Sequence, residues 1–316
     1  MFSRRLLRIK VLQTLYSYHK VDGKTYASSE RDLLHSLEKS YELYHLLMLL
    51  IIDVIDFAES KIEQASQKRI QTPEDLNPNT RFIDNALVKQ LRNNEGFKKF
   101  LTKTHISWVQ SPEIVRNLYL LILDTELYQE YMSAEDHTYM SDKRFLERVL
   151  FNLVMNYEDL YLNLEEQSIF WIDDVDFIIK MIVKTFKKFS AENLQGTELL
   201  PMLKEKDDLS YCKKLLRTTI KNEAEYLELI KASANNWELE RIAFTDSLIL
   251  QLAISEAIEF KSIPIKVTIN EFIEIAKLYS TQKSSQFING ILDNIFTGLK
   301  AEGKIVKTGR GLIGEV

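Results

Sequence analysis

Hydrophobic and polar positions along this chain follow a helical period almost throughout. The strongest pattern is SLILQLAISEAIEF at residues 247–260, which leaves almost no polar face on a helix. A helix that is apolar nearly all round is a buried one, and this run is too short and too interrupted to cross a bilayer. The pattern therefore predicts the central core helix of an all-α protein.

Two amphipathic segments follow the core helix. Pro264 ends it, because proline lacks an amide donor and disfavours helical geometry at the residue before it. Residues 264–280 and 286–296 then place apolar side chains at helical spacing. Gly290 lies inside the last segment, where it costs about 1 kcal/mol relative to alanine, so we expect a neighbouring helix to pass close to its backbone. Together the three segments predict a compact antiparallel unit.

The N-terminal part of the chain predicts two more helices. Residues 3–18 form an amphipathic helix, and residues 29–64 form a long second one. Ser28 or Ser29 is expected to cap the second helix, with Asp32 in capping-box position after Ser29.

A long central stretch separates these helices from the core unit. It opens with a linker at residues 66–80 and closes with a second break at residues 190–201. Trp108 and Trp171 are expected to anchor the packing between these breaks. Helical patterns lie at residues 82–92, 112–131, 142–164 and 171–189.

Composition places the chain among ordinary globular proteins of the reducing cytoplasm. Of its 316 residues, 45% are hydrophobic and only 9 are glycine and 5 proline, which favours a helical protein with a real core. The single cysteine, Cys212, excludes an internal disulfide and fits a cytoplasmic protein. The first apolar residues are interleaved with arginine, so no signal peptide is visible, and no membrane association is expected.

Charge is unevenly distributed. The formal net charge is −5, which argues against a protein that coats nucleic acid indiscriminately. Residues 1–21, however, contain basic side chains and no acid, and a local basic patch on an acidic protein is compatible with selective RNA binding. Arg4, Arg5 and Arg8 lie near a helix N-terminus, where positive charge is unfavourable. Neutralisation by phosphates and a solvated, fraying terminus both explain this arrangement.

No catalytic or metal-binding constellation is found in the sequence. The five histidines lack metal-ligand spacing and have no partner cysteines. Asp173, Asp174 and Asp176 are typical of a solvated helix start, and Cys212 lies in a helical pattern typical of a small core residue. We therefore expect no catalytic residue, no bound metal and no cofactor, and a protein that is not an enzyme.

Three segments carry the spacing of motifs known from one protein family. The most specific is PIKVTINEFIEIAK at 264–277 followed by FINGILD at 287–293. The segment RRLLRIKVLQTLYSY at 4–18 is the second, and residues 209–230 are a weaker third. In these segments the chain resembles the NusB family of bacterial transcription antitermination factors. The resemblance implies a fold of two small packed helical bundles.

This resemblance also suggests a domain organisation. Residues 1–66 and 206–298 would form the NusB-like RNA-binding domain, and residues 67–205 a helical insertion of unknown role that an ordinary member lacks. Residues 299–316 are expected to be a flexible basic tail. We favour a docking surface for a further partner on the insertion, with a packing extension and an additional RNA surface as alternatives.

The resemblance implies a function in transcription of ribosomal RNA. NusB-like proteins bind single-stranded boxA RNA together with the ribosomal protein NusE, as part of the transcription elongation complex. Carried over residue by residue, the implied RNA-binding positions are Arg4, Arg5, Arg8, Lys266, Tyr279, Lys283, Gln286 and Phe287. Leu6 stands where some members have another arginine, Lys283 where some have an acid, and Gln286 where others have a basic residue.

Several of these positions have a simpler structural explanation. Phe287 is either a ring on which bases stack or the first core position of its helix. Tyr16 and Asp246 are the implied contacts for the protein partner, but Asp246 is also a plausible helix cap. Two other functions remain open. They are a NusB-like domain linked to ribosomal-RNA cytosine methylation, and a docking scaffold that has lost RNA binding.

Overall fold

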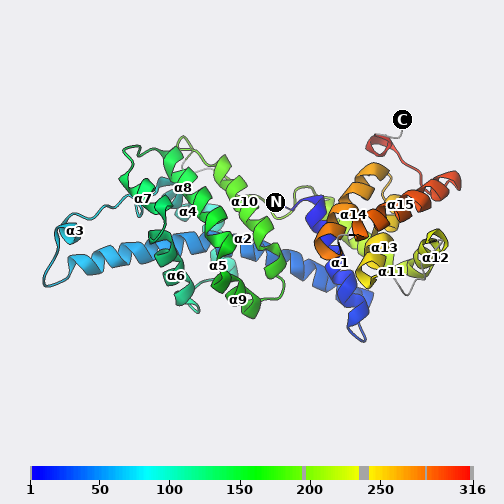
Figure 1. The fold of residues 1–316 in the computed structure, drawn as a ribbon, viewed down its shortest axis with the longest axis horizontal. Coiled ribbons are helices and arrows are strands. Elements are labelled where there is room, and N and C mark those ends of the chain that lie inside the picture. Colours follow the sequence, from blue (N-terminus) through cyan, green and yellow to red (C-terminus); the bar gives the residue numbers. More distant parts are fainter. Residues whose placement is uncertain (1, 194–196, 235–241, 282, 314–316) are drawn as a thin grey trace. The chain divides into compact units, whose positions relative to one another are not determined.

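The protein is all-α, as expected. The computed structural model describes residues 2–193, 197–234, 242–281 and 283–313. These residues contain no strand, only an isolated parallel bridge between Phe2 and Leu203. No described helix combines the length and apolar character needed to cross a membrane. The α-helices, drawn in Figure 1, are α1 (Arg4–Lys20), α2 (Tyr26–Ser66), α3 (Pro73–Leu76), α4 (Ala86–Arg92), α5 (Glu95–Thr104), α6 (Pro112–Leu123), α7 (Glu126–Ser133), α8 (Tyr139–Asn152), α9 (Glu158–Gln167), α10 (Val175–Lys188), α11 (Asp208–Lys221), α12 (Glu223–Ser233), α13 (Phe244–Glu259), α14 (Ile265–Tyr279) and α15 (Ser284–Ala301). Short 3-10 turns are η1 (Val154–Asn156), η2 (Ile172–Asp174) and η4 (Gly309–Leu312).

The chain divides into two compact units. The first combines Met1–Leu37 with Met202–Val316, and the second is Glu38–Pro201. The second unit therefore begins inside α2, whereas the sequence suggested a boundary near residue 66. Two indole groups explain the difference, because Trp108 donates to the backbone oxygen of Leu46 over 2.9 Å and Trp171 to that of Lys39 over 2.8 Å. Both tryptophans are buried, as predicted.

The first unit is built around α13. Its apolar side chains from Leu248 to Ala257 are buried, which confirms the prediction of a central core helix. Helices α1, α11, α12, α14 and α15 pack against it. Helix α1 begins where expected, because the Ser3 hydroxyl accepts from the Leu6 amide over 3.3 Å. Helix α2 begins earlier than expected, because Thr25 and Ser28 exchange side-chain and backbone hydrogen bonds across its first turn.

Within residues 304–313, Ile305, Lys307 and Gly311 are buried against the first unit, contrary to the expectation of a flexible tail. Lys307 is buried, and its ammonium donates to the backbone oxygens of Ala257 over 2.7 Å and Phe260 over 3.1 Å. These carbonyls close the C-terminus of α13, where a cation is favoured. A Cβ atom on Gly311 would lie 2.0 Å from the backbone oxygen of Lys261, so only glycine allows this approach. The basic composition of the tail therefore serves packing as well as solubility.

In the second unit, the predicted central segments are divided into shorter helices. The segment 112–131 contains α6 and α7, separated where the Thr125 hydroxyl accepts from the Tyr128 amide over 3.1 Å. The segment 142–164 likewise contains α8, η1 and the start of α9. Helix α5 was missed, because its apolar residues are sparse and several lysines interrupt them.

Candidate functional site

Helices α1 and α14 form the framework of the candidate site. Arg5 donates two hydrogen bonds of 2.9 Å to the carboxylate of Glu271, and Gln13 donates one of 3.1 Å to the hydroxyl of Tyr279. Both pairs have the same separation in sequence, 266 residues. The two helices therefore run side by side in the same direction.

Arg8 lies inside the unit and not on its surface. Its side chain is 2% exposed and makes two hydrogen bonds, of 2.7 and 2.9 Å, to the buried carboxylate of Glu256. Glu256 also accepts from the hydroxyls of Tyr211 and Thr268. Burial alone would lower the pKa of Arg8, but Tyr211, Glu256 and Glu271 outweigh it, and the pKa is raised above its ordinary value. The expectation that this guanidinium meets phosphate is not met, because it neutralises an internal acid.

Arg4 and Arg5 remain closer to the surface, and each is paired. Arg4 contacts Asp208 over 2.8 Å and lies over the ring of Tyr211, with 4.4 Å between its guanidinium carbon and the ring centroid. Arg5 is bound by Glu271, and the hydrogen bond to Glu271 raises its pKa. A phosphate at either arginine would have to compete with these carboxylates.

The start of α15 presents a different arrangement. Lys283 and Gln286 are exposed and Phe287 is half-buried. Lys283, Phe287 and Gly290 are separated by four and three residues, so they share one face of the helix. The preceding turn is held by hydroxyl contacts of 2.9 Å between Ser280 and Ser284 and of 2.8 Å between Thr281 and Ser284.

Gly290 corrects one prediction from the sequence. Within the described part of the chain, and apart from the chain neighbours and the backbone of α15 itself, no heavy atom lies within 4 Å of the position that a Cβ atom would occupy there, and the residue is exposed. The expected close approach of a neighbouring helix is therefore wrong. The face of α15 next to Phe287 is instead open where a side chain would normally project.

Tyr279 lies beside this face, whereas Lys266 does not. Tyr279 ends α14, directly before the turn that leads into α15. Lys266 is exposed at the opposite end of α14, about 20 Å away along the helix at 1.5 Å per residue.

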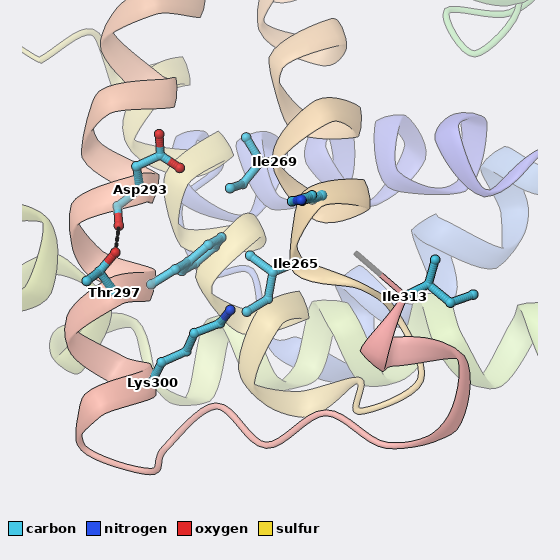
Figure 2. A pocket seen from close by; sticks show the side chains of 8 residues that line it. Ile265, Ile269, Asp293, Thr297, Lys300 and Ile313 are labelled. Carbon is cyan, nitrogen blue, oxygen red and sulfur yellow. Dashed lines mark hydrogen bonds between the residues drawn. The ribbon is translucent and has the colours of Figure 1, made fainter. Parts of the chain in front are cut away.

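Lys266 lines a separate pocket of about 180 Å³ between the start of α14 and the end of α15. Figure 2 shows Asp293, Thr297 and Lys300 from α15 on one side of it, and Ile265 and Ile269 from α14 on the other. The Thr297 hydroxyl donates to the backbone oxygen of Asp293 over 2.7 Å. The predicted RNA-binding residues of α14 and α15 therefore lie at opposite ends of this helix pair. Lys266 is at one end, and Tyr279, Lys283, Gln286 and Phe287 are at the other.

Tyr16 and the start of α13 meet through a residue that the sequence did not single out. The ring of Tyr16, 43% exposed, lies edge-on to the ring of Phe244, 38% exposed, with 5.5 Å between centroids. The ammonium of Lys20 lies 4.3 Å from the centroid of Phe244. Phe244 opens an apolar helix but is partly exposed, and this exposure depends on tertiary packing.

Asp246 is nearly buried in the first turn of α13 but does not cap it. The helix has Ala243 at its N-cap and no side-chain cap hydrogen bond. One carboxylate oxygen of Asp246 has no hydrogen-bond partner within the described part of the chain. The capping explanation from the sequence is therefore wrong, and the aromatic pair Tyr16–Phe244 with Asp246 forms a second candidate surface, which we call the aromatic edge.

Metal binding and cysteine chemistry can both be examined among the described residues. They contain no group of three or more histidine, cysteine, aspartate or glutamate side chains that could hold a metal ion. Cys212 is buried, and burial raises the pKa of its thiol to about 12. Because the thiolate is the nucleophilic form, this cysteine is suited to packing.

Comparison with known proteins assigns the family. The family model described as "NusB family" matches residues 166–297. The transcription antitermination protein NusB of Salinibacter ruber is 42% identical over 125 residues, which are 40% of this chain and 78% of that protein. The NusB protein of Chloroherpeton thalassium is 40% identical over 123 residues, or 39% of this chain and 57% of that protein.

Two further matches agree in name. The NusB protein of Listeria welshimeri is 42% identical over 91 residues, which cover 29% of this chain and 70% of that protein. A solved structure of T. maritima NusB is 27% identical, covers 51% of this chain and 95% of that one, and superposes with a TM-score of 0.30. On the identity and coverage of the Salinibacter relative, with the match to the family model, this chain belongs to the NusB family of transcription antitermination proteins.

Proposed function

We propose that the chain acts without catalysis, by binding a single-stranded boxA-like RNA together with a NusE-type ribosomal protein during transcription of ribosomal RNA. The observation that carries this proposal is the face of α15 formed by Lys283, Phe287 and Gly290. A cation, an aromatic side chain and an open stretch of helix suit an unpaired strand, because bases stack on aromatic rings and lysines meet phosphates.

The rest of the RNA path is proposed along α14. Tyr279 and Gln286 flank the face of α15, and Arg4 and Arg5 lie further along α1, two helical turns from Gln13. Lys266 would contact the strand only if it continues to the other end of α14. In this proposal Arg8 supports α1 from inside and does not contact RNA.

The aromatic edge is the proposed site for the ribosomal protein. Its exposed aromatic pair, Tyr16 and Phe244, has the character of an interface anchor, since aromatic residues are enriched at the energetic centres of protein interfaces. Asp246 is only 5% exposed and its unpartnered oxygen is buried, so in this proposal it contacts that protein only after the start of α13 rearranges. The complex of this chain with the ribosomal protein would then bind the transcription elongation complex.

A binding titration tests the proposal. Fluorescently labelled boxA-like RNA and a scrambled RNA of equal length are titrated with the purified chain, with and without the NusE-type protein. We expect preferential binding of the boxA-like strand, tighter with the partner present and weaker with rising salt, as phosphate contacts require. Equal binding of both RNAs under every condition would contradict the proposal.

A docking scaffold without RNA binding is the second candidate. One observation favours it: all three arginines of α1 are paired with acids of the same unit. In that case the NusE-type protein binds the chain normally while neither RNA binds. A Tyr16→Asp variant should weaken the complex with the NusE-type protein whichever candidate function is right. RNA binding by the chain alone should not change in this variant, which distinguishes the aromatic edge from the face of α15.

A further inference from the structure

The second unit contains a surface groove that the family function does not use. It is formed by η1, α9 and η2, has a volume of about 570 Å³, and is lined by Met155, Asn156, Glu158, Tyr161, Leu162, Glu165 and Ile172. Only Ile172 of this set falls within the residues matched by the family model. The groove therefore belongs to a part of the chain whose role is open.

Helix α9 buries one apolar stripe and exposes a further leucine, flanked by glutamates, on its outer face. Leu160 and Leu164 are fully buried and hold the helix to its unit. On the outer face, Glu158, Leu162 and Glu165 follow at spacings of four and three residues. Leu162 is 61% exposed in the described structure, although a single stripe would suffice to anchor the helix.

Further apolar side chains are accessible in the same segment of the chain. Ile169, in the connection between α9 and η2, is 78% exposed. Met155 and Ile172 line the groove and are only partly covered. The hydroxyl of Tyr161 donates to the backbone oxygen of Met155 over 3.0 Å and to Asp176 over 3.1 Å, which holds one wall of the groove in place.

The groove lies in the most acidic part of the chain. Residues 149–179 contain seven aspartates and glutamates and no lysine, arginine or histidine. This segment alone carries a charge of −7, against −5 for the whole chain, so the remainder is slightly basic. Of the seven acids only Asp174 is buried, where it accepts from the hydroxyl of Ser40. The others are exposed, and Glu158 and Glu165 among them line the groove.

We propose that this groove binds a basic amphipathic helix of a partner protein. Its apolar side chains would enter between Leu162 and Ile172, and its lysines or arginines would meet Glu158 and Glu165. The glutamates of the groove are complementary to the charge of such a helix, and its apolar side chains are complementary to the apolar face. Nucleic acid is disfavoured, because phosphates would face the carboxylates, and a second copy of this chain would bring an equally acidic groove.

Fluorescence anisotropy with a defined probe tests the proposal on the full chain. The probe is a labelled peptide of about 15 residues, long enough to form a helix, with leucine and lysine at amphipathic spacing. One control peptide has the same composition without an apolar face, and another has glutamate in place of lysine. We expect saturable binding of the amphipathic basic peptide and little binding of either control.

Matched variants locate the binding. Leu162→Ser and the double variant Glu158→Lys with Glu165→Lys should each weaken binding by about tenfold, since they remove an anchor and the charge complementarity. The controls are Leu120→Ser on α6, and Glu126→Lys with Glu135→Lys, all exposed positions of the same unit away from the groove. These controls should change the affinity by less than about twofold, as expected for peripheral contacts. Circular dichroism and thermal unfolding confirm that each variant is folded.

Three results would overturn the proposal. They are equal binding of the two lysine-containing peptides, equal losses in the groove and control variants, and no saturable binding at all. Sedimentation velocity tests whether a second copy of this chain occupies the groove. If the unmodified chain forms a dimer and Leu162→Ser abolishes it, the groove is an interface between two copies and the proposal is wrong. Since no RNA is used, these outcomes are independent of the proposed RNA-binding function.

Discussion

The starts of α1 and α15 both carry residues expected to contact RNA, but these residues differ in their ion pairing and exposure. At the start of α1, Arg4, Arg5 and Arg8 are each bound to an acid of the same unit. At the start of α15, Lys283 is exposed and Phe287 keeps part of its surface accessible. The two regions carry similar sequence signals, yet the cations of the first are held in ion pairs within the unit, whereas the second presents Lys283 at the surface.

The difference shows that positive charge in a sequence is not by itself a binding surface. A cation near a helix N-terminus is unfavourable unless something neutralises it. For Arg8 the neutralising group is Glu256, supplied by the core helix of the same chain. The arginines of α1 therefore hold the first unit together, and the binding surface we propose depends on that assembly being intact.

The largest effect is expected at the buried pair. Glu256→Gln leaves the guanidinium of Arg8 buried without its main counter-charge, and should lower the free energy of unfolding by about 3–5 kcal/mol. Glu271→Gln removes a partly exposed carboxylate that pairs with Arg5 and, over 3.6 Å, with Arg8; it leaves the Arg8–Glu256 pair in place and should cost less, about 1 kcal/mol. Urea denaturation followed by circular dichroism measures both. Equal losses would mean that the two arginines do not differ in role.

Phe287→Ala tests the opposite region. We expect RNA affinity to fall by about 1–3 kcal/mol, the contribution of a base stacked on an aromatic ring. Phe287→Tyr retains a ring and serves as the control, with little change in affinity. Thermal unfolding is measured in parallel: if Phe287→Ala destabilises the fold strongly and leaves RNA affinity unchanged, the side chain belongs to the core.

Gly290 and Gly298 form a matched pair on α15. Neither has a heavy atom within 4 Å of the position of an added Cβ. Alanine at either position should raise the free energy of unfolding by about 1 kcal/mol, through helix propensity. Gly290 lies one helical turn from Phe287, whereas Gly298 lies three turns from Phe287 along the same face, about 17 Å away at 1.5 Å per residue, so only Gly290→Ala should weaken RNA binding. Unchanged affinity in both variants would show that the strand does not pass over Gly290.

The smallest effect concerns the salt dependence of binding. Lys283→Gln should reduce the slope of log affinity against log salt by about 0.7, the value for one phosphate contact with a single strand. Lys180→Gln, at an exposed position of the second unit, is the control and should leave the slope unchanged. Titrations at several salt concentrations provide the slope. A similar change in both variants would indicate general electrostatic attraction.

Sequence patterns predicted the helices of the first unit well. The apolar run at 247–260, Pro264 and the two amphipathic segments correspond to α13, its end, α14 and α15. These features are local, because hydrophobic period and proline act within a few residues. The burial of Trp108 and Trp171 was also predicted, because a large aromatic side chain favours the core.

Errors arose where distant residues meet. Gly290 suggested a close neighbour and has none, whereas Gly311 has one at a distance that excludes any side chain. Lys307 looked like part of a flexible basic tail, but the carbonyls at the end of α13 bind it. A glycine or lysine has the same local pattern in either setting, so its environment cannot be read from neighbouring residues.

The sequence by itself determined the helical class, the core helix and the family resemblance, because each depends on periodicity or on motifs within one segment. Only the tertiary structure decided which charges are internal. The pairing of Arg8 with Glu256 joins residues 248 positions apart, and no local pattern encodes such a partner. The same holds for the exposure of Phe244, since burial depends on which helices pack against a side chain and not on its own helix alone.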